Sequence, residues 1–245
     1  MKWLRSGYFY IVLGVTTTIY TAKSFLWHYY AQFSAKGDPS DASHKVASRW
    51  ARSIMCWTPG WTIQVTGEEH LPKLGQACVI VANHESGTDI LAMYYLGIQF
   101  RWLAKKELFS YPLIGSSMKW AGYVPIVRTN TDSQRQALVT SAAWLKKGTP
   151  MFFFPEGTRS TTGTLKKFKK GAFKLAKDCT VPILPVCIKG AGNLLQKGTM
   201  IPHSATVYVK VLPQIAINED ESVENFANRV QNEISLHHDT LGNRA

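Results

Sequence analysis

The chain carries two short clusters of polar side chains whose types could carry out acid–base chemistry. The first is Asn83-His84-Glu85-Ser86-Gly87-Thr88-Asp89, where an imidazole precedes a carboxylate by five positions. The second is Phe154-Pro155-Glu156-Gly157-Thr158-Arg159, where a carboxylate and a guanidinium share a short turn. Together they predict a general base with its orienting acid, facing a polar site for an anionic substrate.

The first cluster follows a β-branched run, 79–82, and precedes an apolar helical stretch, 90–96. Residues five apart on a regular helix lie about 140° apart, so His84 and Asp89 would not meet on one helix. A turn at Ser86-Gly87-Thr88 would bring them together beyond the carboxyl end of a strand. A carboxylate bonded to one ring nitrogen would leave the other nitrogen basic. The alternative is that the acid only caps a helix and the histidine is a polar loop residue.

The second cluster also follows a predicted strand. The apolar run 151–154 is ended by Pro155, which cannot donate to a sheet ladder. Glu156 and Arg159 therefore lie just past the strand end, where a guanidinium suits bidentate recognition of a phosphate or a carboxylate. The alternative is a structural Glu–Arg pair that only fixes the turn.

Length and charge are compatible with an enzyme that acts on anions. The 245 residues are enough for one α/β domain and a small appendage. The net charge of +12 predicts an anionic partner: phosphate head groups, coenzyme A or an acidic carrier protein, or nucleic acid. Nucleic acid is disfavoured, because no helix-turn-helix, zinc-finger or RNP-like pattern accompanies the charge.

One dense basic block follows the second cluster and has two interpretations. It is either a solvated helix face or a surface that attracts anionic lipid or another of the anionic partners named above. Its members are Lys166, Lys167, Lys169, Lys170, Lys174 and Lys177.

Cysteine and histidine usage argues against a metal site. The four cysteines have no CxxC pairing, which favours a reducing, cytosolic environment. His84-Glu85 begins like the zinc motif HExxH, but Thr88 stands where the second histidine belongs. His237 and His238 are expected on an exposed helix surface rather than in a ligand pair.

The residues 1–58 differ in composition from the rest and predict a two-helix unit. The apolar, aromatic stretch 6–22 is shorter than the ~20 residues of a spanning helix. It resumes after Lys23 as 25–30, which is rich in residues that favour the membrane interface. A break at 37–39 precedes a second, aromatic and basic helix, and such a unit fits insertion into one leaflet. The alternatives are ordinary packing on the domain and a single span by the first helix.

The residues 59–245 alternate between strand and helix patterns. This alternation predicts an α/β fold with a mostly parallel or mixed sheet covered by helices. Strands are expected at 61–66, 77–82, 100–104, 123–127, 151–154, 183–188 and 205–212, and helices at 133–147 and 221–237.

From about Leu71 to Gly190 the chain resembles the PlsC-type 1-acyl-sn-glycerol-3-phosphate acyltransferases. That family has four ordered sequence blocks, and all four are found here. Blocks one, three and four are matched by Asn83, His84, Ser86 and Asp89, by 155–160 continuing into 168–172, and by 181–186. Block two is looser: Gly122 and Arg128 are in place, but 125–127 departs from the usual aromatic and polar pair.

The resemblance implies transfer of a fatty acyl group from a thioester to the 2-hydroxyl of lysophosphatidic acid, giving phosphatidic acid. His84 would act as the general base and Asp89 would orient it. The donor would be acyl-coenzyme A or acyl-carrier protein as a co-substrate, and no cofactor or metal is implied.

The resemblance also implies a set of substrate-binding residues on three loops. The cationic members would hold the acceptor phosphate, a carboxylate and a glycine would hold its glycerol part, and backbone N–H groups of the second cluster would stabilise the oxyanion. The residues are Lys105, Arg128, Glu156, Gly157, Thr158 and Arg159.

Two alternative functions remain from the sequence. One is acylation of glycerol-3-phosphate or another lysophospholipid, and the other is a non-catalytic lipid-binding membrane scaffold. The expected location is the cytoplasmic face of the cell inner membrane, with the membrane lipid surface as a partner through the N-terminal helices.

Overall fold

The computed structural model describes residues 2–34, 37–160, 164–195 and 201–242. Its centre is a seven-stranded sheet in the order β1-β7-β6-β2-β5-β3-β4. All neighbours pair in parallel except β6 and β7, so the predicted mixed sheet is confirmed. The strands are β1 (Trp61–Thr66), β2 (Val79–Ala82), β3 (Arg101–Lys105), β4 (Val124–Ile126), β5 (Met151–Phe153), β6 (Ile183–Lys189) and β7 (Ala205–Val211).

Each predicted strand is present, and its ends differ from the predicted ones by at most two residues. The central strands β2 and β5 are buried along their whole length, which explains their continuous apolar runs. Because side chains alternate along a strand, Ile80 belongs to one core and its neighbours Val79 and Val81 to the other. The sheet thus separates two hydrophobic cores.

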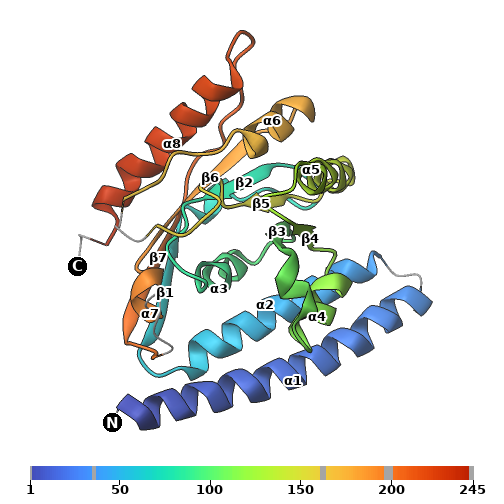
Figure 1. The fold of residues 1–245 in the computed structure, drawn as a ribbon, viewed down its shortest axis with the longest axis vertical. Coiled ribbons are helices and arrows are strands. Elements are labelled where there is room, and N and C mark those ends of the chain that lie inside the picture. Colours follow the sequence, from blue (N-terminus) through green and yellow to red (C-terminus); the bar gives the residue numbers. More distant parts are fainter. Residues whose placement is uncertain (1, 35–36, 161–163, 196–200, 243–245) are drawn as a thin grey trace.

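Helices cover both faces of the sheet (Figure 1). The predicted helices at 133–147 and 221–237 are present, and their N-caps are Asn130 and Ser222. The helices after the first two are α3 (Asp89–Met93), α4 (Ile114–Trp120), α5 (Thr131–Lys146), α6 (Gly171–Asp178), α7 (Ala191–Leu194) and α8 (Val223–Thr240). The short 3-10 segments are η1 (Glu68–His70), η2 (Tyr94–Leu96) and η3 (Lys106–Ser110).

The first helix, α1 (Lys2–Ser34), is longer than the sequence pattern predicts. It runs without a break for 33 residues, so Lys23 does not interrupt it. The exposed Lys23 ammonium lies 5.0 Å from the ring centre of Tyr20, on the outer side of the helix. The expectation of a stretch too short to span is therefore wrong, since 3–34 is long and apolar enough to cross a membrane.

The second helix, α2 (Pro39–Trp57), lies between α1 and the sheet (Figure 1). Trp50 Nε1 donates to Thr17 Oγ1 at 3.1 Å and fixes the two helices side by side. On its other face, Ile54 and Met55 belong to the same core as the sheet. The predicted division after residue 58 falls at the end of α2, and it stays a prediction.

Candidate active site

The loop after β2 brings the imidazole and the carboxylate of the first cluster into contact. His84 Nδ1 lies 2.7 Å from Asp89 Oδ2. The same oxygen accepts from the backbone N–H groups of Glu85 at 2.8 Å and Ser86 at 2.9 Å. Asp89 begins α3, so the predicted turn between β2 and this helix joins the two side chains.

The surroundings leave one nitrogen of His84 available for chemistry. Because Nδ1 is committed to Asp89, the proton-accepting nitrogen is Nε2. The ring stacks on Phe154, with 4.0 Å between ring centres and 18° between planes, which fixes its orientation. Asp89 is fully buried, and this burial raises the pKa of its carboxyl group, while the hydrogen bond from His84 acts in the opposite direction.

Two other polar residues of the loop, Asn83 and Thr88, hold it against β6 and α7. Asn83 Nδ2 donates to the carbonyl of Ile188 at 2.7 Å, and Ile188 N–H donates back to Asn83 Oδ1 at 2.8 Å. Thr88 Oγ1 donates to the carbonyl of Ala191 at 3.0 Å. These bonds hold the loop at the carboxyl end of the central strands.

Glu156 joins the two clusters through the backbone. Its Oε1 accepts from His84 N–H at 2.8 Å, and its Oε2 accepts from Lys166 N–H at 3.1 Å. The side chain is 4% exposed, and burial raises the pKa of its carboxyl group against the effect of these donors. Between the described residues, Glu156 forms no ion pair with Arg159, so the Glu–Arg pair considered as an alternative is absent. Glu156 positions the loop that carries His84, and its contact with the acceptor stays a prediction.

Two arginines converge beside this loop. A Cβ added to Gly87 would lie 2.9 Å from Arg159 Nη2, so the guanidinium lies against the turn between His84 and Asp89. Arg128 Nη1 donates to the carbonyl of Gly157. Burial, and then the nearby Arg159, lower the pKa of Arg128, as expected where two guanidinium groups share one site.

A lysine joins the arginines, and sequence reasoning did not single it out. Gly157 has a left-handed backbone with φ of 73°, and a Cβ there would lie 2.9 Å from Lys169 Nζ. Lys169 and Arg128 both line a cavity of about 200 Å³. The sequence signals for Lys169 were its membership of the basic block and its place in 168–172, the continuation of block three.

The other two predicted binding residues lie at the edge of this group. Lys105 is the last residue of β3 and is exposed, so it follows a strand end at the same edge of the sheet. Thr158 Oγ1 accepts from Lys166 Nζ at 3.1 Å and therefore stabilises the turn.

The basic block has a divided role. Lys167 and Lys170 pair with Glu224 of α8, and Lys174 pairs with Asp178 on its own helix. These pairs are structural, whereas Lys166 and Lys169 face the second cluster. The block is therefore partly a solvated helix face and partly a wall of the site.

The expectation for His238 is wrong. This residue is 8% exposed, and its Nε2 lies 3.1 Å from Oε1 of Glu85, the residue that follows His84 in sequence. Glu85 Oε2 also accepts from the N–H groups of Gly190 and Gly192. A contact across 153 residues has no local sequence signal, so only the tertiary structure identifies this brace.

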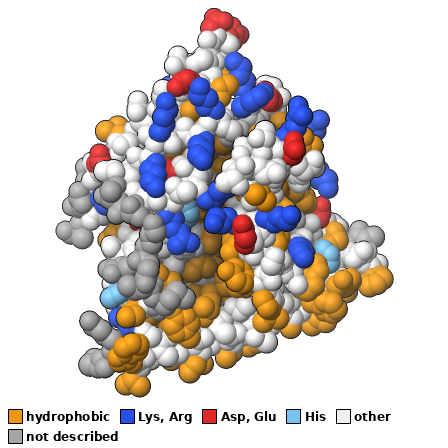
Figure 2. Space-filling model, viewed as in Figure 1, with side chains coloured by type: hydrophobic (Ala, Val, Ile, Leu, Met, Phe, Trp, Pro, Cys, Tyr) orange, Lys and Arg blue, Asp and Glu red, His pale blue; other side chains and the backbone are white. Residues whose placement is uncertain are grey.

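One cavity is lined by His84, and a second reaches the nearby Gly87. A cavity of about 430 Å³ is lined by His84, Glu156, Lys189 and His238. A more apolar cavity of about 270 Å³ reaches Gly87 from between α1, α2 and α4. Figure 2 shows a hollow on this face, with Lys and Arg side chains gathered above it and hydrophobic side chains along the lower edge, over α1. Nowhere in the described ranges do three His, Cys, Asp or Glu side chains form a group that could hold a metal ion.

Comparison with known proteins gives a consistent result. The sequence model of the Acyltransferase family matches residues 62–189. The chloroplastic 1-acyl-sn-glycerol-3-phosphate acyltransferase LPAT1 of Arabidopsis thaliana is 36% identical over 198 residues, which cover 80% of this chain and 54% of that protein. A 1-acyl-sn-glycerol-3-phosphate acyltransferase of Borreliella burgdorferi is 31% identical over 165 residues, covering 67% of this chain and 66% of that protein.

Among solved structures, the fold is similar to that of the 1-acyl-sn-glycerophosphate acyltransferase PlsC from Thermotoga maritima. The TM-score is 0.85 at 26% identity, covering 100% of this chain and 97% of that one. In contrast, the chain spans about half the length of the plant relatives that it matches.

Proposed function

Since the chain belongs to the Acyltransferase family, we propose that it transfers a fatty acyl group from an acyl thioester to the free 2-hydroxyl of lysophosphatidic acid. The product is phosphatidic acid. The observation that carries this proposal is the contact of His84 with Asp89 beside a group of cations that suits a phosphomonoester. The names of the relatives support the same reaction.

The chemical step needs one base and no covalent intermediate. His84 Nε2 removes the hydroxyl proton while the oxygen attacks the thioester carbonyl. Asp89 holds the Nδ1 proton and stabilises the imidazolium that forms. The tetrahedral intermediate then expels the thiolate, which takes the proton back from His84. An acyl ester and a free thiol result.

The acceptor phosphate is assigned to the cations at the strand ends. Arg159 and Arg128 lie close enough to lower the pKa of Arg128, and a bound phosphate dianion would relieve their repulsion. Lys169 adds a third donor beside Gly157. Lys105 is the more distant member of this set, and its contact with phosphate is part of the proposal.

The acyl chains are assigned to apolar surface beside the catalytic turn. The cavity that reaches Gly87 is lined by Trp50, Ile90, Trp102 and Met118, and it opens between the helices that would touch lipid. A fatty chain placed there has its reactive end at the loop that carries His84. The donor, coenzyme A or carrier protein, would approach from the basic side of the hollow (Figure 2).

The direct test is acyl transfer to lysophosphatidic acid from long-chain acyl-coenzyme A and, separately, from acyl-carrier protein. Formation of phosphatidic acid supports the proposal and identifies the donor. If product forms with glycerol-3-phosphate but not with lysophosphatidic acid, the acceptor is glycerol-3-phosphate instead. If the protein binds lysophosphatidic acid but forms no product with any donor, it is better described as a non-catalytic lipid-binding protein.

Arg159→Ala is expected to raise the KM for lysophosphatidic acid by about tenfold or more while kcat changes little. The reason is that a charge-assisted contact to the phosphate is made in the ground state as well as in the transition state. Steady-state kinetics with varied acceptor measures this. Arg135→Ala, which removes an exposed arginine from α5, is the matched control. A fall in kcat at unchanged KM would contradict the assignment.

We further propose that the N-terminal helices hold the protein in one leaflet at the cytoplasmic face of the inner membrane. The 33 residues of α1 extend about 50 Å, longer than the ~30 Å hydrocarbon core. Yet α1 is fixed along the domain: Arg5 Nη2 donates to the carbonyl of Pro59 at 2.8 Å, and Thr21 Oγ1 accepts from Ser117 at 3.2 Å. A helix attached to the domain at both Arg5 and Thr21 favours a position parallel to the membrane plane.

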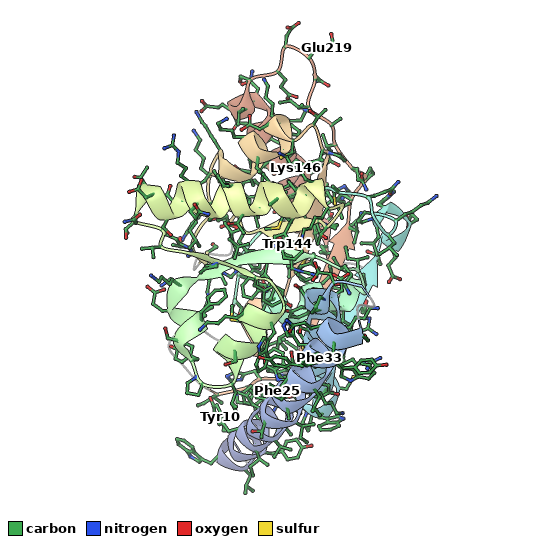
Figure 3. The ribbon with its side chains drawn as sticks, turned by 90° about the vertical axis from the view of Figure 1, so that its right-hand side faces the viewer. Tyr10, Phe25, Phe33, Trp144, Lys146 and Glu219 are labelled. Atoms are coloured by element: carbon green, nitrogen blue, oxygen red, sulfur yellow. The ribbon has the colours of Figure 1, made fainter. Side chains whose placement is uncertain are left out.

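The outward side of α1 is strongly apolar. Figure 3 shows Tyr10, Phe25 and Phe33 on this helix at one end of the molecule. Phe33 is 85% exposed and Leu4 is 80% exposed, whereas Thr16 and Ser24 are buried on the inner side. In a helix on a water-exposed surface, polar side chains face outward and apolar ones inward. The opposite arrangement in α1 is expected of a helix whose outer face meets lipid rather than water.

The double variant Leu4→Ser with Leu26→Ser is expected to weaken binding to phospholipid vesicles at least tenfold. Each leucine that loses its place in the membrane removes about 2 kcal/mol of burial energy. Vesicle co-sedimentation measures the change. The control is Val139→Ser with Leu236→Ser, which removes exposed apolar side chains from α5 and α8. Equal binding by both doubles would contradict insertion of α1.

A further inference from the structure

A large cavity of about 640 Å³ lies at the edge of the sheet opposite the catalytic loop. Its lining includes 72–75, 97–99 and 147–150, which precede β2, β3 and β5. The catalytic histidine instead follows the carboxyl end of β2. Because β2 alone is about 13 Å long, the cavity and the active site are separate.

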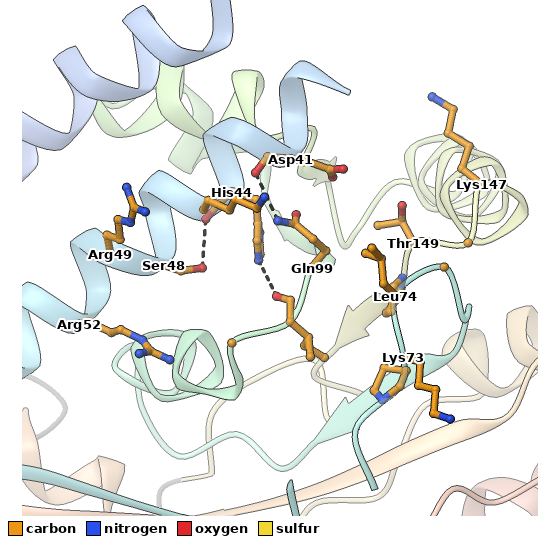
Figure 4. A pocket seen from close by; sticks show the side chains of 17 residues that line it. Asp41, His44, Ser48, Arg49, Arg52, Lys73, Leu74, Gln99, Lys147 and Thr149 are labelled. Atoms are coloured by element: carbon orange, nitrogen blue, oxygen red, sulfur yellow. Dashed lines mark hydrogen bonds between the residues drawn. The ribbon is translucent and has the colours of Figure 1, made fainter. Parts of the chain in front are cut away.

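The cavity is lined by cations from two walls (Figure 4). On α2, Lys45, Arg49 and Arg52 follow one another at helical spacing, so they share one face. Lys73 and Lys147 line it from the loops before β2 and β5. Convergence of five cations on a concave surface concentrates positive potential inside it.

The negative charge at this cavity does not balance the cations. Its single lining carboxylate, Asp41, is engaged at 2.6 Å by the fully buried Arg101. Lys147 lies 3.7 Å from Asp38 and over the ring of Trp144. Within the part of the chain that the structure describes, Lys45, Arg49 and Lys73 have no ion pair.

The cavity is also held in a fixed shape. Arg52 is fixed by a 3.2 Å hydrogen bond to the carbonyl of Tyr95 and lies 5.3 Å from the centre of that ring. Gly148 approaches the carbonyl of Gly75 so closely that a Cβ would lie 2.6 Å from it. The buried His44 binds Tyr123 and the carbonyl of Ile98 through its two ring nitrogens. Fixed walls reduce the entropy cost of binding a ligand.

We propose that this cavity is a second anion site, which binds a phosphate-bearing ligand between α2 and the loops that precede β2 and β5. Lys45, Arg49 and Lys73 donate to the phosphate oxygens, and Arg52 contributes charge from the end of the α2 stripe. Two sources share this chemistry: the headgroup of an anionic phospholipid, since α2 packs against α1, and a free phosphate in solution. The proposal of this second anion site does not depend on the proposed acyltransferase reaction.

The test compares two double variants that each remove two positive charges. Lys45→Gln with Arg49→Gln alters the cavity, whereas Arg135→Gln with Lys146→Gln alters exposed positions on α5. Both are made in full-length Arg159→Ala protein, so that the proposed acceptor site does not obscure phosphate binding. Calorimetric titration with inorganic phosphate and co-sedimentation with phosphatidylcholine vesicles, with and without phosphatidylglycerol, are the two measurements.

The cavity double is expected to bind inorganic phosphate about tenfold more weakly than the control double. If only the cavity double variant loses the preference for vesicles that contain phosphatidylglycerol, the ligand is a lipid headgroup. An unchanged lipid preference with weaker phosphate binding identifies a soluble phosphate. Equal behaviour of the two doubles in both measurements would overturn the proposal, because diffuse surface charge would then explain all binding.

Discussion

Replacing His84 with alanine is expected to reduce kcat for acyl transfer by about 10²–10⁴-fold. The imidazole can take the hydroxyl proton on Nε2, since its other ring nitrogen is bound to Asp89. The measurement is phosphatidic acid formation under saturating donor and acceptor, with lysophosphatidic acid binding measured separately.

The control for this variant is His70→Ala, which removes a partly exposed histidine of η1. Its turnover should equal that of the parent protein. The His84→Ala protein should still fold, because Asp89 keeps two backbone donors after the imidazole is lost. Near-normal turnover by His84→Ala would show that another group is the base, even if the reaction is the proposed one.

Asp89→Asn is expected to have the next largest effect, lowering kcat by about 10²-fold or more with little change in KM for the acceptor. The amide has the shape of the carboxylate but no negative charge to stabilise the imidazolium. With its oxygen at the position of Oδ2, the amide would also place its NH₂ at the buried position of Oδ1, which has no hydrogen-bond partner among the described residues, so the NH₂ donors would be left unpaired.

Steady-state kinetics of Asp89→Asn and of Asp132→Asn, a control at an exposed carboxylate on α5, would measure this. The control separates loss of this particular charge from loss of any charge. If Asp89→Asn raised KM and left kcat unchanged, the carboxylate would serve substrate binding instead of the base. Circular dichroism of both variants checks that each remains folded.

The helices and strands were predictable because each depends mainly on the residues within its own segment. Strands such as 79–82 and 151–153 are apolar throughout, and a run of this kind bounded by turn residues has few alternatives. Pairing order was not predictable, since β2 has β5 and β6 as neighbours and neither follows it directly in sequence. The length of α1 was underestimated, because a single exposed lysine does not end a helix whose other face is packed.

The contact between His84 and Asp89 was predictable, whereas the surroundings of the expected binding residues were predictable only in part. His84 and Asp89 are five residues apart, so a turn alone can join them. Glu156 was predicted to touch the acceptor, whereas both its oxygens bind backbone N–H groups of the loops. Both partners of the Glu156 carboxylate are backbone N–H groups. Since every residue except proline has such a group, the sequence contains no residue pattern that predicts these contacts.

The sequence by itself determined the elements and the chemistry: apolar strands followed by an imidazole, a carboxylate and guanidinium groups at their carboxyl ends. The tertiary structure alone decided which distant groups meet. It joined Glu85 to His238 across 153 residues and gathered cations of α2 and two loops around one cavity. The physical reason is that secondary structure follows from neighbours along the chain, whereas these contacts depend on how the sheet orders its strands and on which helices cover each face.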